Sequence, residues 1–410
     1  MLSESYLYTS DAIQDSLKHL GPNGIVAAQF GEVDFANKPN RTTRYVSTAR
    51  RALANLGVKD PKDHVLVATS PTQLGASSVS TILVKRSPFT AAETDRFISQ
   101  LKNIPQTTLQ YAPGHPIPGQ PVSDVITTPN NQLNAWYDSY RFNVRPITDD
   151  GPFFWHFTTF PSVIRHIGDP VSQFDFENAT GERVLLLLVG VSTAFAAIFL
   201  LLPFLAIRKT WAVLPRKGRS AIYFVSLGLG FLFFEITLIQ RLTLFLGYPT
   251  YSLTVTLASL LIFTGVGALL SDRFKDRPLR AMPVLFGVLA ALTLFYLFGL
   301  PKVTSAALGW PLFGRVVIAF VSLAPLGVCL GAFMPLGLGA VAGLTEDHAR
   351  EYVAWGWAVN GFASVIGAVL TTILAMSFGF HVVLVLALIA YFIAMIALRS
   401  LLAPSPALRK

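Results

Sequence analysis

The sequence predicts a protein of two parts, an α/β segment followed by an all-α bundle of about seven membrane-spanning helices. Hydrophobic residues make up 52% of the 410 residues and charged residues only 13%, whereas an ordinary soluble protein carries about 25% charged residues. Most acidic residues precede Glu182, and the long apolar runs follow it. Helix and strand signals alternate along the part before these runs. We therefore place a boundary near residue 183.

Three helices and three strands are expected before residue 103, in the order helix, strand, helix, strand, strand, helix. Thr9, Ser10 or Asp11 can cap the first helix, Thr90 can cap the third, and Gly57 provides a stop for the second. Each expected strand is a short, largely apolar run. The expected helices lie at 12–20, 42–56 and 91–101, and the expected strands at 25–30, 64–69 and 80–85.

This alternation favours an α/β layer with a largely parallel sheet in residues 1–102. The last two strands are too close in sequence for a crossover helix, so we expect them to form an antiparallel hairpin. Three strands are few for a sheet whose two faces must both be covered. Residues 1–102 are therefore expected to be only part of an α/β domain.

Residues 103–183 are rich in Pro, Asn, Gln and aromatic residues, and we expect them to be an irregular connector. The aromatic residues at 153–157 can be explained in two ways. Aromatic side chains close to a span suit the interface between water and lipid. They can equally form a local hydrophobic cluster beneath a loop.

Seven apolar segments in residues 184–400 approach the roughly 20 residues that are needed to cross the hydrocarbon core of a bilayer. The second of them is the weakest candidate, because Glu235 and Gln240 lie in it. The expected spans lie at 184–207, 221–240, 249–271, 281–300, 314–338, 354–376 and 379–398.

Basic residues near the ends of these spans predict the orientation. Thirteen lie on the side of the C-terminus and three on the other side, and Lys and Arg accumulate in cytoplasmic loops. We therefore expect a multi-pass protein of the cell membrane with residues 401–410 as a cytoplasmic tail. The thirteen are Arg208, Lys209, Arg216, Lys217, Arg219, Arg273, Lys275, Arg277, Arg280, Arg350, Arg399, Arg409 and Lys410; the three are Arg241, Lys302 and Arg315.

The positive charge of the sequence does not indicate a nucleic-acid partner. The net charge of +9 would suggest nucleic acid in a soluble protein, but here it is explained by the loops between spans, so the lipid bilayer is the expected partner. Cys329, the single cysteine, excludes a disulfide within the chain. The histidines show no metal-ligand spacing, and no metal site is expected.

Four segments together resemble the membrane-bound spermidine synthase-like proteins, in which a class I S-adenosylmethionine-dependent methyltransferase-type domain is joined to hydrophobic helices. The segments are 3–8 (SESYLY), 20–29, 148–154 (TDDGPFF) and 235–247 (EITLIQRLTLFLG). The resemblance implies that residues 1–102 are the C-terminal half of a Rossmann-like class I methyltransferase domain. It also implies aminopropyl or methyl transfer from decarboxylated S-adenosylmethionine or S-adenosylmethionine, in the inner membrane of a bacterium.

The cofactor-binding signature of that family does not occur in this sequence. Residues 1–180 contain no Gly-x-Gly-x-x-Gly, and the turn at 21–24 precedes a strand, whereas a phosphate-binding loop follows a strand and opens a helix. The resemblance therefore implies cofactor-binding residues upstream of Met1, or a separate chain that supplies the N-terminal half of the domain. We expect residues 1–410 to bind no cofactor alone and to be inactive as an isolated chain.

Asp149 and Asp150 are the candidate catalytic residues, since adjacent carboxyl groups can act as general acid and base. Such a pair more often caps a helix or a turn. Within the spans, the candidates are Glu235, Gln240, Arg241 and Asn360. An ionisable residue inside a membrane is costly and suggests function, and we expect Glu235 to pair with Arg241 or with an arginine of a neighbouring helix. For Asn360, hydrogen bonding between packed helices is the simpler explanation.

A second interpretation is a small-solute transporter or a membrane scaffold with a soluble appendage. Pro325 and Pro335 lie in the fifth span together with several glycines. A helix broken there could line a transport site, whereas a simple kink would not.

Overall fold

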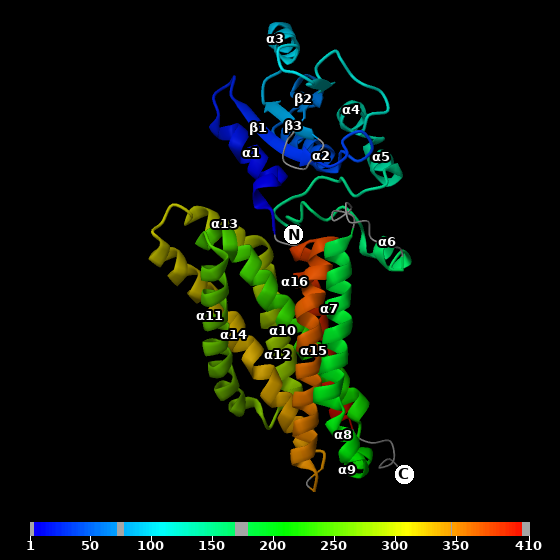
Figure 1. The fold of residues 1–410 in the computed structure, drawn as a ribbon. Helices are drawn as coiled ribbons and strands as arrows, with labels where there is room; N and C mark the ends of the chain where they lie inside the picture. Colours follow the sequence, from blue (N-terminus) through cyan, green and yellow to red (C-terminus); the bar gives the residue numbers. More distant parts are fainter. Residues whose placement is uncertain (1–3, 72–77, 169–178, 346, 404–410) are drawn as a thin grey trace. The chain divides into compact units, whose positions relative to one another are not determined.

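The computed structural model describes residues 4–71, 78–168, 179–345 and 347–403. Ser3 and the last seven residues, among them Arg409 and Lys410, lie outside the described residues. The chain forms two compact units, Met1–Val184 and Leu185–Lys410, which we call the N-terminal unit and the helical unit (Figure 1).

The N-terminal unit contains the six expected elements, each confirmed to within two residues at either end. Thr9 accepts a hydrogen bond from the backbone N–H of Ala12 at the start of the first helix, and Thr90 forms a capping box with Glu93 at the start of the third. The elements are α1 (Ser10–His19), β1 (Ile25–Glu32), α2 (Asn40–Asn55), β2 (Val65–Ser70), β3 (Ser78–Lys85) and α3 (Ala91–Leu101).

The sheet has the strand order β1-β3-β2-β4, where β4 (Thr108–Tyr111) is a strand that the sequence did not reveal. All three neighbouring pairs are antiparallel. The predicted hairpin of β2 and β3 is confirmed, but the largely parallel sheet is wrong. Helix α2 does return the chain so that β1 and β2 run in the same direction. β3 then lies between them and pairs antiparallel with both, so that no two parallel strands are neighbours.

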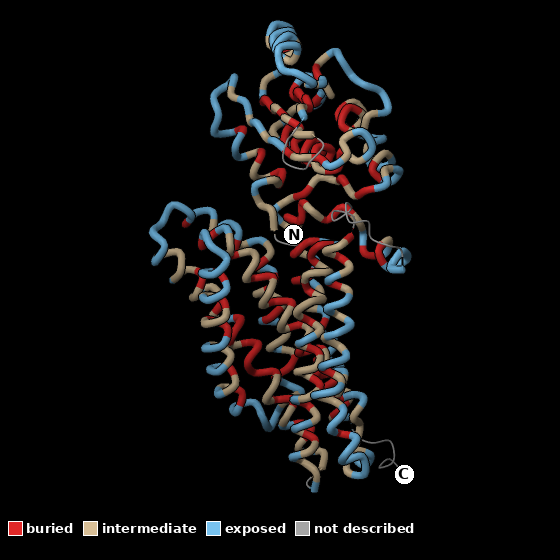
Figure 2. Tube along the Cα trace, in the orientation of Figure 1, coloured by how far each residue is buried: buried red, intermediate tan, exposed pale blue. Residues whose placement is uncertain are grey.

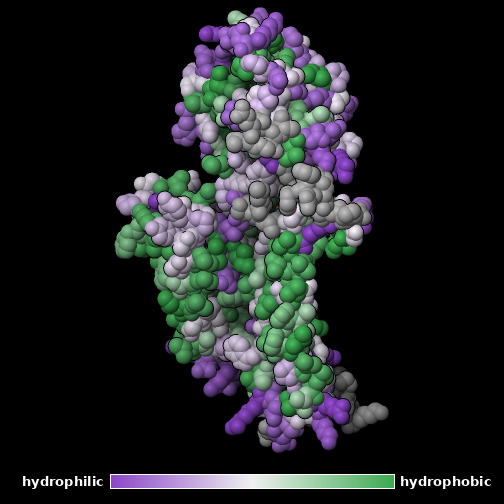
Figure 3. Space-filling model, viewed as in Figure 1, coloured by the Kyte–Doolittle hydropathy of each residue, from purple (hydrophilic) through white to green (hydrophobic). Residues whose placement is uncertain are grey.

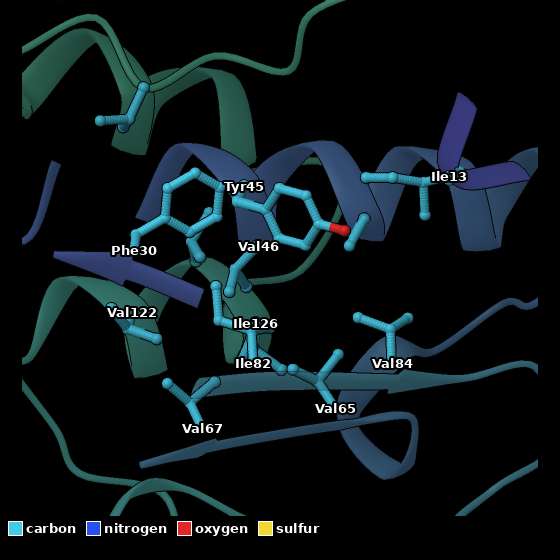
Figure 4. Close-up of a cluster of buried hydrophobic side chains, with 14 of the residues drawn as sticks. Ile13, Phe30, Tyr45, Val46, Val65, Val67, Ile82, Val84, Val122 and Ile126 are labelled. Carbon is cyan, nitrogen blue, oxygen red and sulfur yellow. The ribbon is translucent and has the colours of Figure 1, made fainter. Parts of the chain in front are cut away.

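Alternating residues of the strands face two separate hydrophobic cores. Val65, Val67, Ile82 and Val84 pack with residues of α1, α2 and α4 (Pro121–Thr127) in the larger core (Figure 4). Leu66 and other residues of the opposite face pack with α3 in the smaller core. The period of two along the strands explains this division. Helix α2 is buried along most of its length (Figure 2).

The segment expected to be an irregular connector forms part of this core. Besides β4 and α4 it contains α5 (Leu133–Ser139) and α6 (Phe160–Arg165). Phe154 and Phe157 are buried in the larger core, as the explanation by a local cluster requires. Two buried arginines of α2 hold the segment, because they donate hydrogen bonds to its backbone carbonyl groups.

Seven helices are long and apolar enough to cross a membrane, which confirms the expected number of spans within the described residues. Large apolar side chains such as Leu269 and Phe313 are exposed, and hydrophobic residues cover much of the helical unit in the view of Figure 3. α7 and α8 lie in one of the seven, Thr180–Ala206, whose start belongs to the N-terminal unit, and α12 and α13 lie in another, Pro278–Ala306. The helices are α7 (Thr180–Ala196), α8 (Pro203–Ala206), α9 (Arg208–Val213), α10 (Lys217–Leu246), α11 (Pro249–Ser271), α12 (Pro278–Leu294), α13 (Leu300–Ala306), α14 (Leu312–Ala342), α15 (Ala349–Phe378) and α16 (Phe380–Leu402).

Glycines allow α11 and α14 to approach each other backbone to backbone. A Cβ atom on Gly331 would lie 2.1 Å from the carbonyl oxygen of Thr264, and one on Gly267 would lie 2.1 Å from that of Val328. Such close approach is a common mode of helix association in membranes. Helix α14 continues through Pro325 and Pro335 without interruption, so the broken helix considered above does not occur.

Two of the basic residues that predicted the orientation bind the end of a helix. Arg216 donates hydrogen bonds to the carbonyl groups of Leu401 and Ala403, and Arg219 donates one to that of Ser400, all at the C-terminal end of α16. Cations are favourable at this end of a helix because of its dipole. The side of the membrane on which the C-terminus lies remains a prediction from the charge distribution.

Candidate functional site

A buried carboxyl group lies at the carboxyl end of β1. Glu32, the last residue of this strand, is fully buried. The backbone N–H of Thr42 and its hydroxyl group donate hydrogen bonds of 2.7 and 2.8 Å to Oε1 of Glu32. Thr42 lies in the first turn of α2, where backbone N–H groups lack partners within the helix and negative charge is favourable. Glu32 thus links the end of a strand to the start of a helix.

Arg41, Ser80 and Trp155 complete what we call the Glu32 cluster, with Glu32 and Thr42. The hydroxyl oxygen of Ser80 lies 2.7 Å from that of Thr42. Arg41 donates a hydrogen bond to the carbonyl group of Gly31, and its guanidinium group lies 5.0 Å from the ring centre of Trp155. The cluster therefore combines a carboxyl group, two hydroxyl groups, a cation and an aromatic ring.

Burial raises the pKa of Glu32 to about 7, although its hydrogen bonds from Thr42 and the charge of Arg41 lower it. A carboxyl group with a pKa near neutrality can exchange a proton at physiological pH, as a general base must. Buried groups with shifted pKa values concentrate at functional sites, although structural networks shift them too. No motif surrounds Glu32 in the sequence, so sequence analysis missed it.

This pKa predicts a pH-dependent effect of Glu32→Gln. Because burial raises the pKa from 4.5 to about 7, the protonated carboxyl group stabilises the fold fully below about pH 4.5, and this stability is lost as the pH rises to about 7. The glutamine cannot ionise. The wild type should therefore lose about 2 kcal/mol of its free energy of unfolding, compared with the variant, between about pH 5 and about pH 8.

Thermal unfolding of the full chain in detergent, followed across this pH range, measures the effect. Asp95→Asn provides the control, since Asp95 is exposed on α3. If the stability of Glu32→Gln follows the wild-type pH dependence in parallel, the buried carboxyl group does not titrate as described.

Asp149 is placed against the start of α1. Its Oδ1 accepts a hydrogen bond of 2.6 Å from the hydroxyl of Thr9, and its backbone N–H donates one of 3.0 Å to Asp11. Burial raises the pKa of Asp149 to about 6; the hydrogen bond from Thr9 lowers it, and the charges of Asp11 and Asp15 raise it. These contacts match the structural alternative, in which the pair at 149 and 150 holds a turn.

Two of the segments that carry the family resemblance, 3–8 and 148–154, are in contact in the N-terminal unit. The backbone N–H of Ser5 donates a hydrogen bond of 2.6 Å to the carbonyl oxygen of Pro152. The ring centres of Tyr8 and Phe154 lie 4.8 Å apart, and each lies 5.2 Å from the ring centre of Phe30. Segments about 140 residues apart in the chain thus meet beside β1, two residues from Glu32.

A second polar cluster is buried where α7 begins. Nδ1 of His156 lies 2.7 Å from Oε1 of Glu182, and both side chains are almost completely buried. Arg44 donates hydrogen bonds to the carbonyl oxygens of Phe154 and His156, at 2.9 and 2.7 Å. Burial lowers the pKa of Arg44 to about 9, and Glu182 acts in the opposite direction. Glu182 therefore compensates the positive charge of Arg44 in the core.

The expected pair of Glu235 and Arg241 does not form. Arg241 donates a hydrogen bond of 2.9 Å to the carbonyl group of Tyr296, and its Nη2 lies 3.1 Å from Nε2 of His381 on α16. Six positions along a helix place Glu235 and Arg241 on different faces. Glu235 forms no hydrogen bond or ion pair with the described residues. Gln240 is half-buried next to Arg241.

Asn360 has the packing role that we considered simpler. Its Nδ2 donates a hydrogen bond of 3.2 Å to the carbonyl group of Phe224, which joins α15 to α10. A Cβ atom on Gly228 would lie 2.6 Å from the carbonyl oxygen of Asn360, so the two helices are in close contact here. Such contacts stabilise helix pairs in membranes.

The part of the chain that the structure describes has no group of three or more His, Cys, Asp or Glu residues that could hold a metal ion. Comparison with known proteins adds no identification: no protein-family model, curated protein or solved structure matches the chain.

Proposed function

We propose that this chain is a multi-pass membrane protein whose N-terminal unit provides the acceptor side of a spermidine synthase-like transferase. The reaction would transfer an aminopropyl or methyl group from an S-adenosylmethionine-type cofactor to an amine or another small acceptor. The seven membrane-length helices support the membrane part of the proposal. The sequence resemblance and the Glu32 cluster support the transferase part.

The observation that carries the proposal is the position of Glu32. Glu32 ends β1 at the point where the chain passes to α2, and its buried carboxyl group accepts hydrogen bonds from Thr42 in the first turn of that helix. A carboxyl group with a pKa of about 7 suits an amine acceptor, because it can accept the proton that the amine must lose to become a nucleophile. Arg41 and Trp155 would border such an acceptor site.

The residues present do not fit the cofactor itself. The connection between β1 and α2, residues 33–39, contains no glycine, and the side chain at the strand end is hydrogen-bonded to Thr42. Close approach of a backbone to phosphate or ribose groups normally requires glycines at this place. We therefore assign no cofactor contact to this chain.

One edge of the sheet could accept further strands. β1 pairs with β3 along its whole length, and its other edge pairs with no strand among the described residues. An unpaired edge strand can accept a strand from elsewhere. Cofactor-binding strands from a preceding segment or from a separate chain would extend the sheet there.

The test is to produce residues 1–410 alone and together with the polypeptide encoded directly upstream, either fused in frame or co-expressed. We expect binding of S-adenosylmethionine or its decarboxylated form only in the second case. In that complex, Glu32→Gln should lower the rate of transfer to an amine by about 100-fold or more, since general base catalysis contributes that much. Asp95→Asn should leave the rate unchanged. Calorimetry measures cofactor binding, and transfer of label to the acceptor measures the rate.

Tight cofactor binding by residues 1–410 alone would show that the chain does not need a second part. An unchanged rate in Glu32→Gln would remove the proposed role of Glu32.

Transport has less support. The broken helix on which it partly depended is absent, since α14 is continuous, and Asn360 is used in helix packing. Glu235 remains the candidate for a function inside the membrane.

A further inference from the structure

The N-terminal unit contains a pocket of 340 Å³ between α2 and α5, and no residue of the Glu32 cluster lines it. One side is lined by Ser47, Arg50 and Arg51, which lie on one face of α2 because residues three and four apart are neighbours on a helix. Asn134 and Tyr137 of α5 line the other side. The volume is within the range of small-molecule sites.

Arg50 forms a fixed positive wall of this pocket. It is almost completely buried, and it donates hydrogen bonds to the carbonyl group of Thr128 and to Oδ1 of Asn130, both at 2.7 Å. These partners are neutral, so they hold the guanidinium group in place without cancelling its charge. Burial lowers the pKa of Arg50, while the charge of Asp60 raises it.

Arg145 adds a second cation next to an aromatic ring. Its guanidinium group lies 5.2 Å from the ring centre of Tyr137. It donates hydrogen bonds to Asn134 at 3.0 Å and to Asp138 at 2.6 Å. The side chain of Asp138 is 74% exposed, so solvent weakens its compensation of the pocket's charge. The hydroxyl of Tyr137 donates a hydrogen bond of 3.1 Å to Ser47.

Arg51 differs from the other two arginines, because it is exposed and forms no hydrogen bond or ion pair with the described residues. Its five N–H donors are thus available to a ligand. A guanidinium group presents them in a planar fork that matches a carboxylate or a phosphate group. Helix α2 contains four arginines and no acidic residue, so nothing within the helix competes for Arg51.

We propose that this pocket binds a small organic oxyanion. The carboxylate or phosphate group is held by Arg51 in the positive field of Arg50 and Arg145, and the rest of the ligand lies against Tyr137 and Leu133. The pocket combines an apolar wall with a few convergent polar groups, as small-molecule sites do. This inference does not depend on the transferase proposal, because it involves neither Glu32 nor a cofactor.

The phosphate group can belong to a free small molecule or to a lipid headgroup, and the experiment separates these sources. The full chain is reconstituted in nanodiscs of phosphatidylcholine alone and in nanodiscs that also contain phosphatidic acid. Each sample is titrated with inorganic phosphate and with succinate by calorimetry. In phosphatidylcholine we expect saturable binding of at least one of these anions. Weaker binding in the presence of phosphatidic acid would identify a lipid headgroup as the occupant, and equal binding would identify a free anion.

Arg51→Gln is expected to weaken anion binding about tenfold, because it removes charge-assisted hydrogen bonds. Arg86→Gln is the matched control, since Arg86 is exposed just after β3, outside the pocket. Both variants should fold, because both side chains are exposed, and thermal unfolding verifies this. Failure of the wild type to bind either anion in phosphatidylcholine, or equal affinities of wild type and Arg51→Gln, would overturn the proposal.

Discussion

Replacing Glu182 with alanine is expected to lower the free energy of unfolding of the N-terminal unit by about 3 to 5 kcal/mol, the range found when one partner of a buried ion pair is removed. The carboxylate lies 2.7 Å from Nδ1 of His156 and acts electrostatically on the buried Arg44. Its loss leaves the buried charge of Arg44 without this counter-charge. That is more costly than the loss of one hydrogen bond.

The effect can be measured as a fall in the temperature at which the N-terminal unit unfolds or becomes sensitive to protease, with the full chain in detergent. Glu351→Ala is the matched control. Glu351 also lies in the first turn of a long helix, α15, but it forms no hydrogen bond or ion pair with the described residues. The comparison separates the buried partners of Glu182 from the helix dipole. Equal stability of Glu182→Ala and wild type would contradict the prediction.

The second large effect is expected for Gly331→Ala in α14. The added Cβ atom would lie 2.1 Å from the carbonyl oxygen of Thr264 and 2.7 Å from its carbonyl carbon. These are backbone atoms, so no side-chain rotation can relieve the overlap, and α11 and α14 must separate. Overpacking of this kind costs about 3 kcal/mol, although alanine is the better helix former.

Thermal stability and the yield of monodisperse protein on size-exclusion chromatography measure this loss. Gly265→Ala in α11 is the control, because a Cβ atom there has nothing within 4 Å, and it should be neutral or slightly stabilising. If both alanine variants behaved alike, the close contact of α11 with α14 would not limit stability.

Local sequence patterns predicted the α-helices and strands of residues 1–102 well. Beyond the hairpin of β2 and β3, they did not predict which strands pair with each other in the sheet. The positions of α1 and α3 follow from polar caps and apolar periodicity, and that of α2 from its periodicity and the stop at Gly57; these are local properties. The sheet order depends on β3 inserting between β1 and β2, and no local pattern encodes that insertion. β4 is only four residues long and lies in a Pro-rich and Gln-rich segment, so its strand signal was weak.

The candidate site was predicted less well than the fold. Asp149 was noticed because two acidic residues are adjacent, yet its hydrogen bonds hold a turn against α1. Glu32 is a single residue, and its significance arises from burial and from Thr42, ten positions later. Arg44 and Arg50 appeared as ordinary basic residues of a helix. Their contacts with carbonyl groups more than 70 positions away exist only in the folded chain.

The position of Glu182 has a consequence for the biosynthesis of this protein. The residue completes a buried cluster with His156 and Arg44, and it also belongs to the first turn of the first membrane span. A nascent chain that ends before residue 182 cannot finish the core of its N-terminal unit. Final consolidation of that unit must therefore wait until the first span has been synthesised, so folding outside the bilayer and insertion into it are linked in time.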